Sequence, residues 1–156
     1  MIEVLFICLG NICRSPMAEA VFRDLVKKKG LEGKISVDSA GTGSWHVGNP
    51  PHEGTSSLLK EKGINTEGMA ARVVAEEDLE KFDYLIAMDA ENISALKRMA
   101  RNSGNTAISR LLDLVDESET KDVPDPYYTG NFEEVYSLVT RGCEKLLDRI
   151  VKEHNL

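Results

Sequence analysis

The sequence has few cysteines, no long apolar run and no excess of positive charge. Its three cysteines, Cys8, Cys13 and Cys143, are too few and too unevenly spaced for a disulfide scaffold, and they do not support a four-ligand zinc site. No apolar stretch is long enough to cross a bilayer. The first residues, MIEVLFICLG, are short and lack the basic start of a signal peptide. We therefore expect a cytoplasmic protein without membrane insertion.

The charge balance argues against nucleic acid as a partner. The formal net charge is -7 at pH 7, whereas binding to nucleic acid needs a basic surface that displaces counterions from phosphates. An anionic substrate remains compatible with this charge, because nearby amides and single cationic side chains set the field inside a small pocket. The 156 residues are enough for one domain with its own core, so we expect a single domain over 1–156.

The stretch VLFICLGNICRSPMAEA predicts a strand, a tight loop and a helix in succession. Residues 2–8 read as a strand buried on both faces. Ser15 is a candidate N-cap and Pro16 fits the first helical position, which predicts a helix from Pro16 to about Lys29. The loop before it therefore lies at the positive end of a helix dipole, where free N–H groups suit an anion. Gly10 allows close backbone approach, and Asn11 tolerates a left-handed conformation. The predicted phosphate-binding loop comprises Leu9, Gly10, Asn11, Ile12 and Cys13, between Cys8 and Arg14, together with Ser15 directly after Arg14.

Cys8 and Arg14 bracket this loop and can attack and bind a phosphoryl group. The planar guanidinium of arginine donates to two phosphoryl oxygens at once, which lysine cannot do. Thiolates at helix N-termini or beside cations have pKa values of roughly 3.5–7.5, against about 8.5 for a free thiol. We expect Cys8 to be mostly ionised at neutral pH. The alternative is a buried structural cysteine with a chance C-x5-R spacing, but the strand, the glycine and the Ser-Pro pair around it favour the functional interpretation.

The loop sequence CLGNICRSP resembles the signature of the low-molecular-weight protein tyrosine phosphatases. The likeness continues through DSAGTGSW at 38–45, MD at 88–89 and DPYY at 125–128. This resemblance implies an α/β fold, a three-layer sandwich with a central four-stranded parallel sheet flanked by helices. It also implies hydrolysis of phosphomonoesters through a cysteinyl-phosphate intermediate, with no metal and no cofactor.

Asp125 is the candidate general acid and base. Pro124 and Pro126 restrict the backbone on both sides of it, so its carboxyl group is held rigidly. We predict that Asp125 protonates the leaving phenolate and later takes a proton from water; a positioned acid contributes roughly 10²–10⁴-fold to a rate. Asp-Pro pairs are also ordinary turn formers. Asp122 is the second candidate acid.

Three aromatic residues are candidates for contact with the ring of the substrate. Trp45 lies in the glycine- and proline-rich loop 40–54, and Tyr127 and Tyr128 follow the candidate acid. We expect them to form walls for an aryl phosphate, with each good stacking pair contributing about 0.5–1.5 kcal/mol. The alternative is that Trp45 anchors its loop to the core. In family members that act on phosphoarginine, the resemblance implies a threonine at the position that matches Ile12. The larger, apolar Ile12 therefore favours phosphotyrosine.

The resemblance also assigns supporting residues. Ser39 matches a serine that hydrogen-bonds the loop asparagine, here Asn11, although a serine at a strand end can also satisfy its own backbone. Cys13 is expected to form a reversible, protective disulfide with Cys8, unless it only packs within the loop. Met69 stands where family members often have a histidine that supports the same asparagine, which leaves one hydrogen bond in question.

The rest of the chain predicts the remaining elements of this fold. Further strands are expected at 35–39, 84–88 and 107–112, helices at 53–62, 75–82, 90–101 and 132–153, and a loop at 116–131. A strand, a helix and a strand between residues 2 and 39 favour a parallel, right-handed crossover. Asp89 either caps the next helix or faces the site, with capping favoured. Cys143 is predicted to lie in the core.

Three functions compete for this sequence. The leading prediction is a phosphatase that acts on tyrosine-phosphorylated proteins through Cys8 and Asp125, with a cognate tyrosine kinase as a reasonable regulatory partner. Phosphoarginine hydrolysis or arsenate reduction on the same scaffold is an alternative, although a reductase needs additional thiols for a relay. A non-enzymatic phosphoprotein-binding module is the third, and it would need neither the acid nor the aromatic walls.

Overall fold

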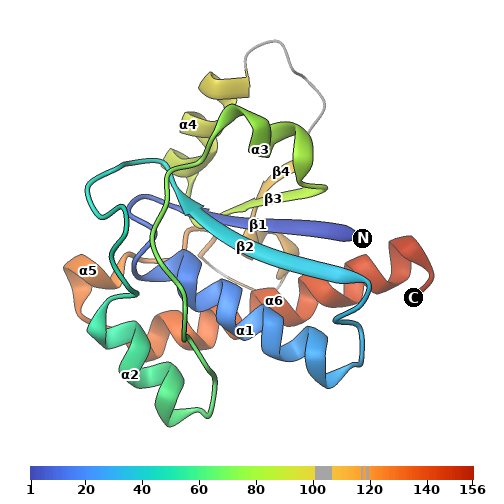
Figure 1. Ribbon diagram of the computed structural model, residues 1–156, viewed down its shortest axis with the longest axis horizontal. Helices are drawn as coiled ribbons and strands as arrows, with labels where there is room; N and C mark the ends of the chain where they lie inside the picture. The colour runs from blue at the N-terminus through green and yellow to red at the C-terminus, as the bar shows by residue number, and fades with distance from the viewer. Residues whose placement is uncertain (101–106, 117, 119) are drawn as a thin grey trace.

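A parallel sheet of four strands forms the centre of the computed structural model, which describes residues 1–100, 107–116, 118 and 120–156. The strand order is β2-β1-β3-β4 (Figure 1). The strands are β1 (Ile2–Cys8), β2 (Ile35–Gly41), β3 (Tyr84–Ala87) and β4 (Ala107–Arg110). Every neighbouring pair is parallel. The predicted α/β fold with a four-stranded parallel sheet is confirmed.

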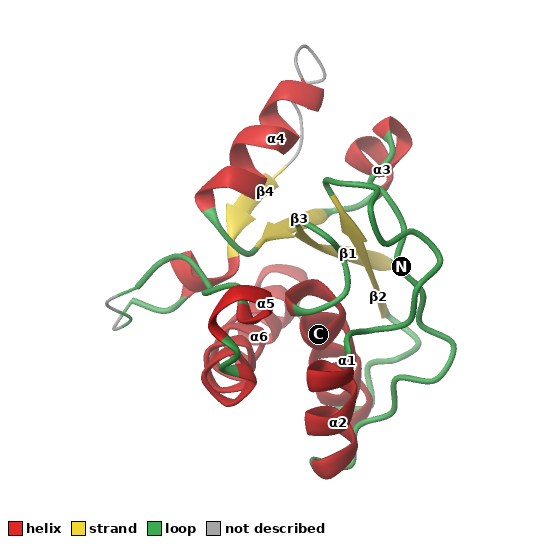
Figure 2. Cartoon of the chain, turned by 90° about the vertical axis from the view of Figure 1, so that its left-hand side faces the viewer, coloured by secondary structure: helices red, strands yellow, loops and turns green. Residues whose placement is uncertain are grey.

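Helices cover both faces of this sheet. They are α1 (Arg14–Lys28), α2 (Glu53–Glu61), α3 (Glu76–Lys81), α4 (Ala90–Ala100), the 3-10 helix η1 (Leu111–Leu114), α5 (Pro126–Thr129) and α6 (Phe132–His154). α1, α2 and α6 lie on one face, and α3 and α4 lie on the other (Figure 2). The predicted three-layer arrangement is therefore present.

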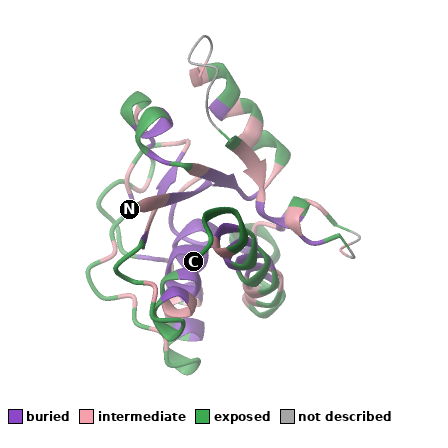
Figure 3. Cartoon of the chain, turned by 90° about the vertical axis from the view of Figure 1, so that its right-hand side faces the viewer, coloured by how far each residue is buried: buried purple, intermediate pink, exposed green. Residues whose placement is uncertain are grey.

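The central strand β1 separates two hydrophobic cores. Side chains alternate along a strand, so Val4 and Phe6 pack with α1 and α6, whereas Leu5 and Ile7 pack with side chains of α3, β3 and α4. All four side chains are 0% exposed. Many of the buried residues lie in the sheet and in α1 (Figure 3). Burial on both faces explains why β1 reads as a continuous apolar run. Cys8 is consequently presented at the end of a rigid, central strand.

Two predicted boundaries near the site are wrong. α1 begins at Arg14 rather than Pro16, and its N-cap is Cys13, without a side-chain cap. Ser15 is not the cap, because its hydroxyl group lies between Cys8 and Asn11. The loop predicted at 116–131 contains the short helix α5, which begins directly after Asp125.

The remaining elements agree closely with the sequence. The predicted strand 107–112 ends at Arg110 because η1 begins there. The predicted end of α4 at Arg101 lies outside the described residues. Cys143 is 0% exposed, which confirms its place in the core. Within the described ranges, no helix combines the length and the apolar character needed to cross a membrane.

Candidate active site

A cavity of about 340 Å³ opens at the carboxyl ends of β1 and β2, where open α/β sheets bind ligands. We call it the Cys8 cavity. Its lining residues are Cys8, Leu9, Gly10, Ile12, Cys13, Arg14, Trp45, His46, Asp125, Tyr127 and Tyr128. Residues far apart in the sequence thus meet at one point, including the predicted nucleophile, the predicted acid and all three predicted aromatic walls.

Asn11 holds the loop between β1 and α1 in its curved form. Its backbone is left-handed, with φ of 57°. Its side-chain Nδ2 donates to Ser15 Oγ at 2.8 Å and to Ser39 Oγ at 3.0 Å. Its Oδ1 accepts from the Arg72 backbone N–H at 3.0 Å. Gly41 of β2 packs against the same loop, and a Cβ atom at this position would lie only 2.8 Å from the carbonyl oxygen of Leu9.

The sulfur of Cys8 lies within this ring of polar groups. It accepts a hydrogen bond from the Asn11 backbone N–H at 3.2 Å, and Ser15 Oγ lies 2.9 Å from it. Cys8 exposes 2% of its surface and lines the cavity. Two polar groups of the loop and of α1 thus contact the sulfur directly.

Arg14 is fixed beside the sulfur by residues from two distant segments. Its Nη1 donates to Asp89 Oδ2 at 2.7 Å and to the Val123 carbonyl at 2.9 Å. Its Nη2 lies 3.4 Å from Asp125 Oδ2. Burial acts to lower the pKa of Arg14, but Cys8, Asp89 and Asp125 hold it above the usual value. Its Nε is buried and has no hydrogen-bond partner among the described residues.

The carboxyl group of Asp125 has its geometry set by α5. Its Oδ1 accepts from the Tyr127 backbone N–H at 3.1 Å and caps this helix. Asp122, the second candidate acid, does not line the Cys8 cavity. It lies 3.2 Å from Arg110 and accepts from the Ala90 backbone N–H at 3.0 Å. Asp125 is therefore the carboxyl group that meets both the cavity and the guanidinium.

The aromatic lining is open to solvent. Trp45 is 71% exposed, Tyr127 is 54% exposed and Tyr128 is 76% exposed. The two tyrosine rings meet edge-on with centroids 5.4 Å apart. The Trp45 ring also covers Gly43, where an added Cβ atom would overlap it. Trp45 thus touches its own loop and lines the cavity, and it belongs to none of the hydrophobic cores of the described residues.

Cys13 is a buried thiol of the same loop. It is 3% exposed, and burial, together with the charges of Asp125 and Cys8, raises the pKa of Cys13 to about 12. Its thiol therefore stays protonated at neutral pH.

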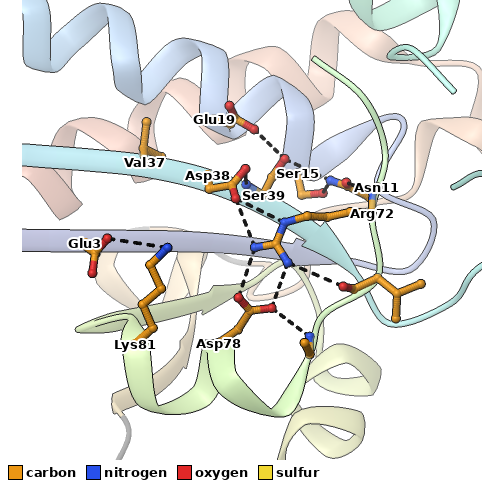
Figure 4. Close-up of polar contacts among 12 residues, drawn as sticks. Glu3, Asn11, Ser15, Glu19, Val37, Asp38, Ser39, Arg72, Asp78 and Lys81 are labelled. Carbon is orange, nitrogen blue, oxygen red and sulfur yellow. Dashed lines mark hydrogen bonds and ion pairs between the residues drawn. The ribbon is translucent and has the colours of Figure 1, made fainter. Parts of the chain in front are cut away.

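Several residues of the site were missed or only half assigned from the sequence. Asp89 both caps α4, through a bond from the Asn92 N–H at 2.8 Å, and pairs with Arg14, so both alternatives hold. His46 lines the cavity although a lone loop histidine gives no signal in a sequence. Arg72 supports the loop asparagine through its backbone N–H, which the sequence did not indicate. Its side chain bridges Asp38 and Asp78 (Figure 4).

Known proteins resemble this chain over its whole length. A family model described as low molecular weight phosphotyrosine protein phosphatase matches residues 3–156. The low molecular weight protein-tyrosine-phosphatase YfkJ of Bacillus subtilis is 65% identical over 156 residues, which cover 100% of both chains. The low molecular weight protein-tyrosine-phosphatase PtpA of Staphylococcus aureus is 46% identical, over 100% of this chain and 98% of its own.

Solved structures give the same result. The crystal structure of YfkJ superposes with a TM-score of 0.96 over 98% of this chain and 96% of that one. DARP, a drosophila arginine phosphatase, has a TM-score of 0.89 at 36% identity, over 96% of this chain and 98% of its own. With a family model over nearly its whole length and a relative at 65% identity, the chain belongs to the low-molecular-weight protein tyrosine phosphatase family.

Proposed function

We propose that this protein hydrolyses phosphotyrosine in proteins, with Cys8 as nucleophile and Asp125 as general acid and base. The observation that carries the proposal is the state of Arg14. Its Nε is buried without a partner among the described residues, and its Nη2 has only a contact of 3.4 Å. An unpaired buried donor costs about 1–3 kcal/mol. Two phosphoryl oxygens bound along this edge of the guanidinium would remove that cost.

The loop provides the second half of the phosphate site. Within the described part of the chain, no acceptor receives a hydrogen bond from the backbone N–H groups of Gly10, Ile12 or Cys13. These groups lie at the positive end of α1, so a dianionic phosphate is stabilised there. The phosphorus is then held close to the sulfur of Cys8.

The first chemical step transfers the phosphoryl group to sulfur. The Cys8 thiolate attacks phosphorus while the bond from phosphorus to the tyrosine oxygen breaks. Asp125, in its protonated form, gives its proton to that oxygen, and tyrosine leaves neutral. The guanidinium of Arg14 stabilises the charge on the equatorial oxygens in the transition state.

The second step restores the enzyme. The Asp125 carboxylate takes a proton from water as the water oxygen attacks phosphorus, and the sulfur–phosphorus bond breaks. Inorganic phosphate leaves and the thiolate returns. The hydroxyl group of Ser15, 2.9 Å from the sulfur, stabilises the thiolate as leaving group.

The lining of the cavity favours an aryl substrate. Trp45, Tyr127 and Tyr128 supply three exposed rings around an opening lined on its inner side by Ile12, which is 8% exposed. Phosphoarginine is the second candidate substrate, because DARP, a structural neighbour, is an arginine phosphatase. A comparison of phosphotyrosine and phosphoarginine peptides decides between them, and we expect higher kcat/KM for phosphotyrosine.

The other parts of the proposal concern setting and control. Tyrosine-phosphorylated proteins in the cytoplasm are the proposed substrates, with a cognate tyrosine kinase as regulatory partner. We also propose a protective disulfide between Cys8 and Cys13. A peroxide oxidises the Cys8 thiolate to a sulfenic acid, and Cys13 then displaces water from it to form the sulfur–sulfur bond.

Hydrolysis of p-nitrophenyl phosphate in the presence of EDTA tests the chemistry. We expect turnover by the unmodified protein, none by Cys8→Ser, and near-normal turnover by Cys143→Ala, which removes a thiol buried away from the cavity. Acid quenching during turnover should trap phosphate on the protein. Activity of Cys8→Ser, or loss of activity on addition of EDTA, would overturn the mechanism.

A further inference from the structure

His52 lies where four segments of the structure meet, although it does not line the Cys8 cavity. Its backbone N–H donates to the Ile12 carbonyl, in the loop between β1 and α1, at 2.7 Å. Its ring stacks on that of Phe132, the first residue of α6, with centroids 5.2 Å apart and 21° between the planes. The same ring meets the Tyr127 ring of α5 edge-on, with centroids 6.0 Å apart. His52 thus joins the start of α2 to α5 and α6 (Figure 1).

The imidazole of His52 also caps α2. Its Nδ1 accepts a hydrogen bond from the Gly54 backbone N–H at 3.0 Å. A ring nitrogen that accepts carries no proton, so the imidazole is neutral with its hydrogen on Nε2. Gly54 leaves room for this arrangement, because an added Cβ atom there would lie 2.4 Å from the Phe132 ring. The cap therefore fixes the position of the ring that Tyr127 and Phe132 contact.

We propose that neutral His52 is a positioning residue for Tyr127, and that proton uptake by its imidazole loosens this wall of the Cys8 cavity. The inference rests on the proposed function, in which Tyr127 contacts the ring of phosphotyrosine. The backbone bond from His52 to Ile12 does not depend on the imidazole, so the phosphate-binding loop keeps its geometry. The protein therefore binds aryl phosphates less tightly in mildly acidic solution, while its affinity for the phosphoryl group alone is unaffected by this residue.

Protonation of the imidazole is incompatible with the cap. An imidazolium carries a hydrogen on both ring nitrogens, so the Nδ1–H of His52 would face the Gly54 N–H, donor against donor. Turning the ring over by 180° does not help, because it brings the hydrogen on Cδ2 to the same place. A positive charge at the N-terminus of a helix also opposes the helix dipole. The ring therefore has to leave its position when it gains a proton, and histidine side chains ordinarily do so at about pH 6.5.

The charges on the elements packed against His52 do not reverse this effect. The charged and titratable residues that adjoin its contacts are Cys13, Arg14, His46, Glu53, Asp125, Tyr127, Glu133 and Glu134. The three glutamates are exposed, so solvent screens their attraction for an imidazolium. Asp125 is 3.4 Å from Arg14 and caps α5. The ring of His46 contacts Tyr127 from another side, with centroids 6.2 Å apart.

NMR of the Tyr127 ring as a function of pH tests the proposal without substrate. We expect the Tyr127 ring signals to shift between about pH 5.5 and about pH 7.5, with the same midpoint as the His52 ring signals. His52→Asn keeps a good N-cap but has no ring that takes up a proton, so the Tyr127 signals should lose that titration. A Tyr127 ring that does not respond to pH in the unmodified protein, or that titrates unchanged in His52→Asn, would overturn the proposal.

The other two histidines of the chain provide matched controls. His154 contacts Tyr84 at the C-terminal end of α6, at 3.0 Å, and His154→Asn should leave both the titration of Tyr127 and KM unchanged. In His46→Asn the Tyr127 signals should still titrate with the midpoint of His52. Loss of the titration in His46→Asn would make His46 the group that responds to pH, and would overturn the proposal. If His52→Asn does not fold, His46→Asn carries the test by itself.

Kinetics connects the titration to the substrate. At about pH 7.5, His52→Asn should raise KM for phosphotyrosine peptides by roughly 2- to 10-fold, the equivalent of one ring contact, with kcat nearly unchanged. The inhibition constant of inorganic phosphate, which fills the loop without reaching the walls, should stay the same. At about pH 5.5 the KM values of the two proteins should converge, because the unmodified protein has then lost the neutral imidazole.

Two kinetic results would overturn the proposal. An equal rise in KM and in the inhibition constant of phosphate would mean that His52 acts on the loop and not on the wall. A ratio of KM values that does not change with pH would mean that protonation of His52 has no effect on Tyr127. The NMR titration needs no turnover, so failure of this inference is distinguishable from failure of the proposed function, which the Cys8→Ser assay reports.

Discussion

Replacement of Asp125 by Asn isolates proton transfer from the other roles of this residue. The new side chain keeps an oxygen that can accept from the Tyr127 N–H, and asparagine is a good N-cap, so α5 should persist. The contact of 3.4 Å with Arg14 loses its charge, but Asp89 and the Val123 carbonyl still hold the guanidinium. The change therefore removes an exchangeable proton and leaves the geometry in place.

The expected loss follows from that separation. A positioned general acid contributes roughly 10²–10⁴-fold, so kcat for phosphotyrosine peptides should fall by about that factor. Binding should not weaken, because one negative charge facing the phosphate has been removed. The effect should be smaller for p-nitrophenyl phosphate, whose leaving group is more acidic and needs less protonation.

Steady-state kinetics with both substrates, together with a binding measurement on a phosphotyrosine peptide, make the test. A Cys8→Ser protein provides the inactive reference, and Asp122→Asn is the matched control, because Asp122 pairs with Arg110 outside the cavity. An equal loss with both substrates would show that Asp125 does not protonate the leaving group. Full activity of Asp125→Asn, or a loss confined to Asp122→Asn, would refute the assignment.

Three further predictions address the walls, the second cysteine and the support of the loop. Trp45→Ala should lower kcat/KM for phosphotyrosine peptides by roughly 2- to 10-fold, the equivalent of one stacking pair, with the melting temperature unchanged; a drop in melting temperature without a change in kcat/KM would make it an anchor. Peroxide inactivation should be reversed by a thiol reductant in the unmodified protein and not in Cys13→Ala, and equal recovery of both would exclude the disulfide. Burial acts to raise the pKa of Asp78, but Arg72, the Ala75 N–H and Lys81 lower it overall. A lowered pKa stabilises the fold at pH values above the pKa of the unfolded state, and this contribution is lost as pH falls through the pKa of the folded state. Urea unfolding should therefore show Asp78→Asn to be less stable than the unmodified protein at pH 7, and the difference should shrink below about pH 4. A difference independent of pH would contradict the ion pair.

The parts of the site that could be predicted are those whose signals are local. The strand before Cys8, the tight turn and the helix after it are encoded within twenty residues, and the rigid Asp125 is marked by its two prolines. Ser15 shows the limit of local signals. A serine before a proline is typical of a helix cap, but here a sulfur and an amide compete for its hydroxyl group.

The parts that could not be predicted depend on partners far away in the chain. Glu19 reads as an ordinary helical glutamate, since nothing near it shows that Ser39 lies against it across the first crossover. Asp89 carries a capping signal but no sign of its pairing with Arg14. Arg72 acts through its backbone as well as its side chain, and a backbone contact leaves no trace in residue type.

The anchoring of Arg14 has a consequence for synthesis of the chain. Two of its contacts are with residues 75 and 109 positions further on. While those residues are still inside the ribosome, the guanidinium has no fixed place. The geometry around Arg14 is therefore completed only when nearly all of the polypeptide has emerged.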